Sequence, residues 1–236
     1  MSPAGFALLA AVVALSAFVQ GASGLGFALI TTPVIGIVHA GLLPVTTLVL
    51  MIPLNAYIAY RDRAHIDRTG AAWITAGRLP ATLGGLILLA TVPAAHLTLL
   101  IGAAIIVASL ASLAAPSFTP GPASLLGSGV ITGIVETATG VGGPPYALVY
   151  QHRPAPVLRS TVALCFLVGE IVSLVVLLAT GKVHPGQIDA ALLLLPALVL
   201  GATASHFVHH RIGGPRVRLG VLAFALASGL ALLVKV

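Results

Sequence analysis

Charged side chains are scarce in this chain of 236 residues, because Asp, Glu, Lys and Arg together make up only 7% of it. Soluble domains carry about 25% of these residues, so this chain has too little polar surface to cover a water-soluble globule. Hydrophobic residues make up 58%, and the mean hydropathy is +1.13. The composition therefore excludes a soluble domain and predicts an integral membrane protein.

Several other classes of site and partner are also excluded by what the chain lacks. Its one cysteine, Cys165, lies in an apolar run, which rules out an intrachain disulfide and a cysteine metal cluster. A histidine cluster at one segment end (His206, His209 and His210) has no carboxylate or cysteine at ligand spacing, so we expect no metal and no cofactor. Basic residues are scattered over short loops, which argues against a nucleic-acid partner.

Two glycine-rich motifs interrupt the apolar sequence 116 residues apart. The first, QGASGLG, covers Gln20 to Gly26, and the second, ETATGVG, covers Glu136 to Gly142. In a bilayer a helix is interrupted only where the freed backbone groups are buried or face a cavity, and paired interruptions are typical of transporters with repeated halves. The sequence therefore predicts two repeats, residues 1–116 and 120–236, that share one central cavity.

The lengths of the apolar stretches predict how each repeat crosses the membrane. Four short stretches flank the two motifs and are expected to form two hairpins of half-length helices. Each repeat then has one hairpin and three spans, and this odd number inverts the second repeat relative to the first. The expected fold class is thus all-α, an integral membrane protein of two inverted repeats. Six longer stretches approach the roughly 20 residues that a span needs, and they begin at Val45, Ala71, Leu97, Val157, Ile188 and Leu219.

The arginines predict the orientation of the chain. They concentrate in three loops, at residues 61–68, 153–159 and 211–218, which fall on one side of the predicted membrane. Cytoplasmic loops carry an excess of Lys and Arg, so we place these loops in the cytoplasm, both termini outside, and the protein in the inner (plasma) membrane. The first stretch, Met1 to Val19, lacks the basic start of a secretory signal and is read as a membrane segment.

The glycine motifs also predict a binding site. Glycine leaves backbone N–H groups uncovered where two half-helices meet, and a helix N-terminus attracts anions. Hydroxyl groups beside the glycines add donors, whereas the alternative explanation is close packing of helices on small residues. The predicted substrate-binding residues are Gln20, Ser23, Gly24, Leu25, Gly26, Thr137, Thr139, Gly140, Gly142 and Gly143.

Ionisable groups within the apolar sequence are the other candidates. Glu136 and Glu170 are predicted to couple transport to protons, because such residues in membrane spans mark pathways and proton relays; alternatively, they are hydrogen-bond donors between helices. Arg78 lies about two turns into its stretch and either extends to the membrane interface, the favoured interpretation, or acts as counter-charge to an anion. Asn55 bonds either a ligand or a neighbouring helix.

Taken with the residues that follow them, the two motifs resemble those of a known family. QGASGLGFALITTPVIG and ETATGVGGPPYALVY, each followed by a threonine-bearing segment (PVTTLVLM and LRSTVALCF), resemble the sulfite exporter TauE/SafE family of membrane transporters over essentially the whole chain. The resemblance implies an exporter of a small anion, such as sulfite or an organosulfonate, and not an enzyme. The expected partners are the anion and membrane lipids, with a homodimer left open.

Two other functions fit parts of the sequence. Gly21 to Gly24 looks like the serine motif of rhomboid intramembrane proteases, with Ser23 as nucleophile and His206 as base. The corresponding residue of the second motif is Thr139, however, which a transporter of two repeats explains and a protease does not. A passive anion channel shares every motif with the transporter, and only Glu136 argues for coupling.

Overall fold

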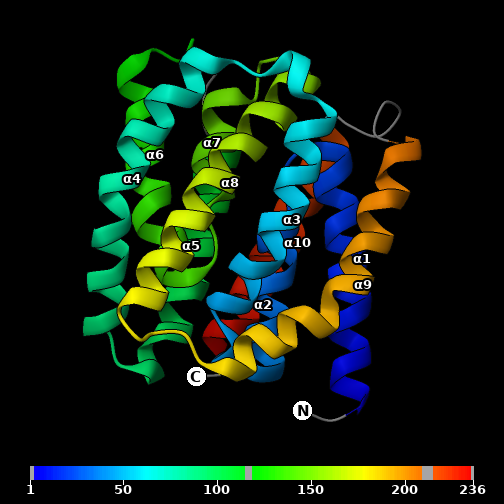
Figure 1. Cartoon of the computed structure of the whole chain (residues 1–236), viewed down its shortest axis with the longest axis vertical. Helices are drawn as coiled ribbons and strands as arrows, with labels where there is room; N and C mark the ends of the chain where they lie inside the picture. The colour runs from blue at the N-terminus through cyan, green and yellow to red at the C-terminus, as the bar shows by residue number, and fades with distance from the viewer. Residues whose placement is uncertain (1–2, 115–118, 209–214, 235–236) are drawn as a thin grey trace.

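The computed structural model describes residues 3–114, 119–208 and 215–234, and within these residues the fold is all-helical (Figure 1). Two short 3-10 helices, Ala40–Leu42 and Arg63–His65, flank α3. The α-helices are α1 (Pro3–Ser23), α2 (Phe27–His39), α3 (Val45–Arg61), α4 (Arg68–Thr91), α5 (Ala94–Ala114), α6 (Pro122–Thr139), α7 (Gly143–Tyr150), α8 (Ala155–Ala179), α9 (Pro185–Val208) and α10 (Pro215–Val234).

Four of the described helices are long and apolar enough to cross a bilayer, namely α1, α4, α8 and α9. The expectation that the first helix of the first hairpin has half the length of a span is therefore wrong, because α1 has 21 residues. Its last turns contain Gln20 and Gly21, which interrupt the hydropathy pattern but stay helical because they are buried against other helices. The second helix of each hairpin is short, with 13 residues in α2 and 8 in α7. The described apolar parts of α3, α5 and α10 are shorter than a span.

Helices from distant parts of the chain pack against each other in a regular set of pairs. In the centre, α3 packs on α8, while α4 packs on α6 and α1 on α9 (Figure 1). A further pair is α5 with α10, and in this pair α5 also contacts α7 while α10 contacts α2. Glycine allows the α4 and α6 backbones to touch, since a Cβ at Gly129 would lie 2.0 Å from the Ile74 carbonyl oxygen. Close approach at small residues is the usual way in which membrane helices pack.

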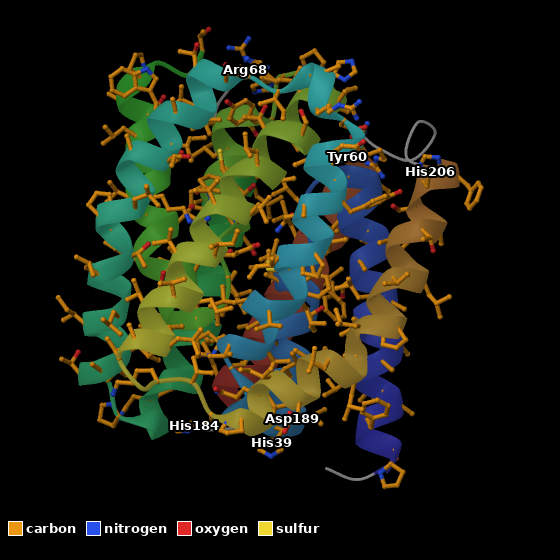
Figure 2. All side chains as sticks on the ribbon, in the orientation of Figure 1. His39, Tyr60, Arg68, His184, Asp189 and His206 are labelled. Carbon is orange, nitrogen blue, oxygen red and sulfur yellow. The ribbon has the colours of Figure 1, made fainter. Side chains whose placement is uncertain are left out.

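The two ends of the bundle differ in charge. Figure 2 places Tyr60, Arg68 and His206 at one end and His39, His184 and Asp189 at the other. The loops at 61–68 and 153–159 both lie at the first end, as predicted, because contacts join them there. The third predicted basic loop falls mostly outside the described residues, with Arg211, His209 and His210 among those left out.

An acidic side chain ties the two basic loops together. Arg159 Nε donates a hydrogen bond to Asp62 Oδ2 (2.9 Å), and Arg61 Nη2 contacts the same oxygen (3.2 Å). Burial of Asp62 opposes its charged form, but the hydrogen bonds and charges of Arg61 and Arg159 outweigh burial and hold the pKa of Asp62 below its ordinary value. A second bond runs nearby, from the Tyr150 hydroxyl to Asp67 Oδ2 (3.0 Å). These contacts join the end of α3 to the start of α8, and the start of α4 to the end of α7.

Candidate functional site

Both glycine motifs end a helix, and they do so with the same backbone geometry. Gly24 has φ of 87° and Gly140 has φ of 77°, the left-handed conformation that glycine adopts without a steric penalty. In each motif the glycine N–H donates to the carbonyl oxygen four residues earlier, that of Gln20 or of Glu136, and both distances are 2.7 Å. The helix breaks therefore occur at the predicted places.

The hydroxyl groups beside these glycines hold the turns in place. Ser23 Oγ lies 2.8 Å from the carbonyl oxygen four residues earlier and accepts a hydrogen bond from the Leu25 N–H (3.3 Å). Thr139 makes the same two contacts, at 2.7 Å and with the Val141 N–H at 3.2 Å. The third predicted donor, Thr137, lies 2.8 Å from the Ser173 hydroxyl of α8. Their role as donors to a substrate stays a prediction.

The residues after the glycines differ between the two breaks. Gly26 precedes α2 with φ of 124°, whereas Gly142 precedes α7 with φ of −128°. A Cβ at Gly142 would lie 2.8 Å from Glu136 Oε2, so this glycine makes room for that carboxyl group. Pro144 and Pro145 follow in α7 and carry no N–H. The second break therefore offers fewer backbone donors than the first.

A cavity of about 240 Å³ lies where the two breaks approach each other. Ser23 and Leu25 line it from the first break, and Gly143 lines it from the second. A Cβ added to Gly143 would lie 3.6 Å from Leu25 Cδ2, so the two segments are in contact. The other predicted binding residues are outside the lining, and Gly140 faces Pro44 and Thr47 instead. The rest of the lining is Ala22, Leu29, Ser112, Pro144, Ala147, Gln151, Arg153, Ala155, Leu158, Val221 and Leu222.

Three polar residues of this lining were missed as site residues by the sequence analysis. Arg153 was predicted only as part of a basic loop. Gln151 directly follows the second glycine-rich hairpin and belongs to no motif of its own. Ser112 reaches the cavity from α5, far away along the chain. The Gln151 Nε2 atom is buried and has no hydrogen-bond partner among the described residues. The cavity thus has a cation and an unused amide donor on its wall.

A chain of hydrogen bonds between buried groups leads from the first break into the centre of the bundle. The Phe27 N–H, the first of α2, donates to Gln20 Oε1 (2.9 Å), and Gln20 Nε2 donates to Asn55 Oδ1 (2.9 Å). Asn55 Nδ2 then donates to Glu170 Oε1 and Oε2, at 2.8 and 3.1 Å. Asn55 therefore bonds neighbouring helices, α1 and α8, which was one of its two expected roles.

An arginine and a glutamate form an ion pair beside this chain. Arg78 is 1% exposed, so the favoured expectation that it extends to the membrane interface is wrong. Its Nη2 pairs with Glu136 Oε2, and its Nη1 donates to the Tyr146 hydroxyl (3.1 Å). The side chain lies against Gly169, where an added Cβ would be 1.5 Å from Arg78 Nε. The sequence could not foresee this burial, because the partner carboxyl group is on another helix.

Ser23 and His206, the nucleophile and base of the protease alternative, bond to other groups. Ser23 Oγ lies 2.7 Å from the Leu25 carbonyl oxygen in addition to its contacts above, and His206 Nδ1 lies 3.3 Å from the Tyr57 hydroxyl. The Ser23 hydroxyl is thus engaged with the backbone of its own turn, where it stabilises the break.

Comparison with known proteins identifies the family. A family model described as sulfite exporter TauE/SafE matches residues 8–232, which include both glycine breaks and every residue of the buried network. Neither the curated proteins nor the solved structures compared with the chain gave a match. The members of this family are multi-pass transporters of the plasma membrane and not enzymes, which confirms the predicted location and excludes the protease. The chain belongs to the sulfite exporter TauE/SafE family.

Proposed function

We propose that this transporter exports a small sulfur-containing anion, such as sulfite or an organosulfonate, through the cavity between the two breaks. The observation that carries the proposal is the lining of that cavity, where Ser23, Gln151 and Arg153 meet. Sulfite and sulfonate oxygens accept hydrogen bonds, and a guanidinium group can donate two parallel hydrogen bonds to a pair of such oxygens. At about 240 Å³ the cavity is smaller than the pockets of drug-sized ligands, which start at about 300 Å³, so it suits a small anion.

The arrangement of the helices supports two inverted repeats, residues 1–116 and 120–236. The contact of α1 with α9 has a counterpart in that of α6 with α4, and the contact of α3 with α9 has one in that of α8 with α4. The corresponding helices α3 and α8 are antiparallel: Asp62 after α3 bonds Arg159 near the start of α8, while Val45 at the start of α3 packs near Leu177 at the end of α8. Exchanging the two halves would therefore preserve the packing.

The position of the cavity supports export. Its lining includes residues 151, 153 and 155, at the end of the bundle that carries the basic loops. The positive-inside rule places this end in the cytoplasm, from which an exporter takes its substrate. At the opposite end Gln187 Nε2 donates to the Gly41 carbonyl oxygen (3.0 Å), and Thr46 Oγ1 donates to that of Gln187 (2.9 Å). These bonds tie α9 to the connection between α2 and α3, as expected for a site accessible from one side.

Transport by purified protein in proteoliposomes tests the proposal. We expect the protein to carry labelled sulfite or methanesulfonate. Arg153→Gln should raise the half-saturating concentration about tenfold, since a hydrogen bond to a charged group contributes about 1.5–3 kcal/mol. Arg63→Gln is the matched control, because it removes the same charge at the same end. Arg63 Nη1 bonds the Tyr60 carbonyl oxygen and is not part of the cavity lining.

The outcomes separate the proposed function from its alternatives. An equal rise of the half-saturating concentration in Arg153→Gln and Arg63→Gln would mean that surface charge and not the cavity attracts the anion. An absence of flux for every sulfur anion tested would refute the proposed substrate class. Flux that only follows the anion gradient, and never accumulates anion when a pH gradient is imposed, would favour the passive channel. A homodimer stays a prediction, which the mass of the detergent-solubilised protein tests.

A further inference from the structure

The buried hydrogen-bond chain has a direction that its first member determines. A backbone N–H can only donate, so Gln20 must turn its Oε1 toward Phe27 and its Nε2 toward Asn55. Asn55 must then present its Oδ1 to Gln20 and its Nδ2 to Glu170. Each amide orientation follows from the one before. In this arrangement Glu170 can only accept hydrogen bonds from Asn55, as an ionised carboxylate does.

The charges around Glu170 set it apart from Glu136. Arg78 of α4 is paired directly with Glu136 of α6, and both act electrostatically on Glu170. The group that reaches Glu170 from α3 is the neutral amide of Asn55, which is bonded in turn to the neutral amide of Gln20 on α1, while Tyr146 of α7 bonds Arg78. A buried carboxylate is stable only when its charge is balanced. One arginine cannot balance two carboxylates, so Glu170 is the group that takes up a proton.

Resting on the proposed function, we propose that Glu170 carries the coupled proton, and that its protonation reverses the hydrogen-bond chain and frees the Phe27 N–H for the anion. A protonated carboxyl group carries an O–H that donates, and Asn55 Oδ1 becomes its acceptor once the Asn55 amide rotates. Asn55 Nδ2 then donates to Gln20 Oε1. Gln20 then turns its Nε2 toward the Phe27 N–H. Two donors face each other, and the hydrogen bond from the Phe27 N–H to Gln20 Oε1 is lost.

The freed N–H lies behind the wall of the cavity, because Phe27 is fully buried while its neighbours form the lining. Leu25 and Leu29, two residues to either side of Phe27, both belong to the cavity lining. A buried donor without an acceptor is unfavourable, so an anion that accepts from this N–H stabilises the protonated state. By linkage the proton strengthens anion binding and the anion strengthens proton binding by the same factor, which is typically about 5- to 150-fold. Proton and anion then bind together and are released together.

Binding of methanesulfonate to the purified protein at different pH values tests this relay. Methanesulfonate keeps its single charge throughout, whereas sulfite itself titrates near neutral pH. We expect wild-type affinity to rise by about tenfold, within the usual range for coupled sites, between about pH 8 and about pH 5. Glu170→Gln removes the titrating group and should make the affinity independent of pH.

Two substitutions cut the relay at different points and should have opposite effects. Asn55→Leu leaves Gln20 bonded to Phe27, so the anion should bind weakly at every pH. Gln20→Met leaves the Phe27 N–H free, so the anion should bind tightly at every pH. Ser16→Ala is the matched control, because Ser16 is also buried on α1 and its hydroxyl donates to the carbonyl oxygen of Val12 on the same helix at 2.6 Å. This control should keep the wild-type pH response.

Several results would overturn the relay. A wild-type pH response in Glu170→Gln would show that the proton is carried elsewhere, and weak binding at every pH in both relay variants would show that the chain only stabilises the fold. Thermal unfolding in detergent confirms that each variant is folded, and Gln20→Met tests the relay alone if Asn55→Leu does not fold. If the wild type binds methanesulfonate with no pH response, the relay fails while the proposed function stands. If it neither binds nor transports any sulfur anion, both fail.

Discussion

Gly169 makes room for the buried arginine, and its replacement by alanine is the most direct test of the central packing. The added Cβ would lie 1.5 Å from Arg78 Nε and 2.0 Å from Cζ. The guanidinium group cannot move aside easily, since Arg78 is 1% exposed and its Cζ lies 5.8 Å from the ring centre of Phe166 and 6.0 Å from that of Tyr146. We therefore expect Gly169→Ala to push Arg78 out of its ion pair with Glu136.

The size of the effect follows from two opposing contributions. Alanine in place of glycine within a helix stabilises by about 0.5–1 kcal/mol, because it restricts the unfolded chain. Breaking a buried ion pair while both charges stay buried costs about 3–5 kcal/mol. The net expectation for Gly169→Ala is thus a loss of roughly 2–4 kcal/mol in the free energy of unfolding.

Reversible unfolding in mixed micelles measures this free energy, and the chain supplies a matched control. Gly127 is in α6, and an added Cβ there would meet no atom of another described segment within 4 Å. Gly127→Ala should leave stability unchanged or raise it by up to about 1 kcal/mol, since only helix propensity changes. If Gly169→Ala is as stable as the wild type, Arg78 does not occupy the space beside Gly169 and is not held in the buried ion pair with Glu136.

Two further predictions concern the charged groups. Glu136→Gln should cost about 3–5 kcal/mol, because it leaves Arg78 buried and uncompensated, and the double variant with Arg78→Met should lose less than the sum of the single changes; additive losses in the same unfolding assay would argue against direct pairing. Asp62→Asn should lower the melting temperature at neutral pH. The depressed pKa of Asp62 means that its contribution is present above the ordinary value of 3.8 and disappears as the pH falls through the lower folded value. Wild-type and variant melting temperatures should therefore converge in acid, and a constant gap would exclude the charge as the cause.

The helix breaks could be predicted from the sequence because a local backbone property determines them. Gly24 and Gly140 adopt left-handed conformations that other residues rarely take, and each follows a hydroxyl residue that closes the turn. The membrane class and the family were also predictable, since composition and motif order do not depend on how helices pack. The length of α1 was not, because Gln20 interrupts the hydropathy pattern and yet remains helical through its buried contacts with Phe27 and Asn55.

The partners of the buried polar residues were decided only by the tertiary structure. Arg78 and Glu136 are far apart in the sequence, and so are Asn55 and Glu170, so no local pattern could say whether each group would find a partner or reach the interface. The same reason hid the cavity lining, because Ser112 of α5 meets Gln151 and Arg153, which follow α7, only in the folded chain. The sequence by itself determined where the helices break and that the chain is an integral membrane protein. Only packing decided which charges are balanced, because the balance of a buried charge depends on groups that the fold brings together.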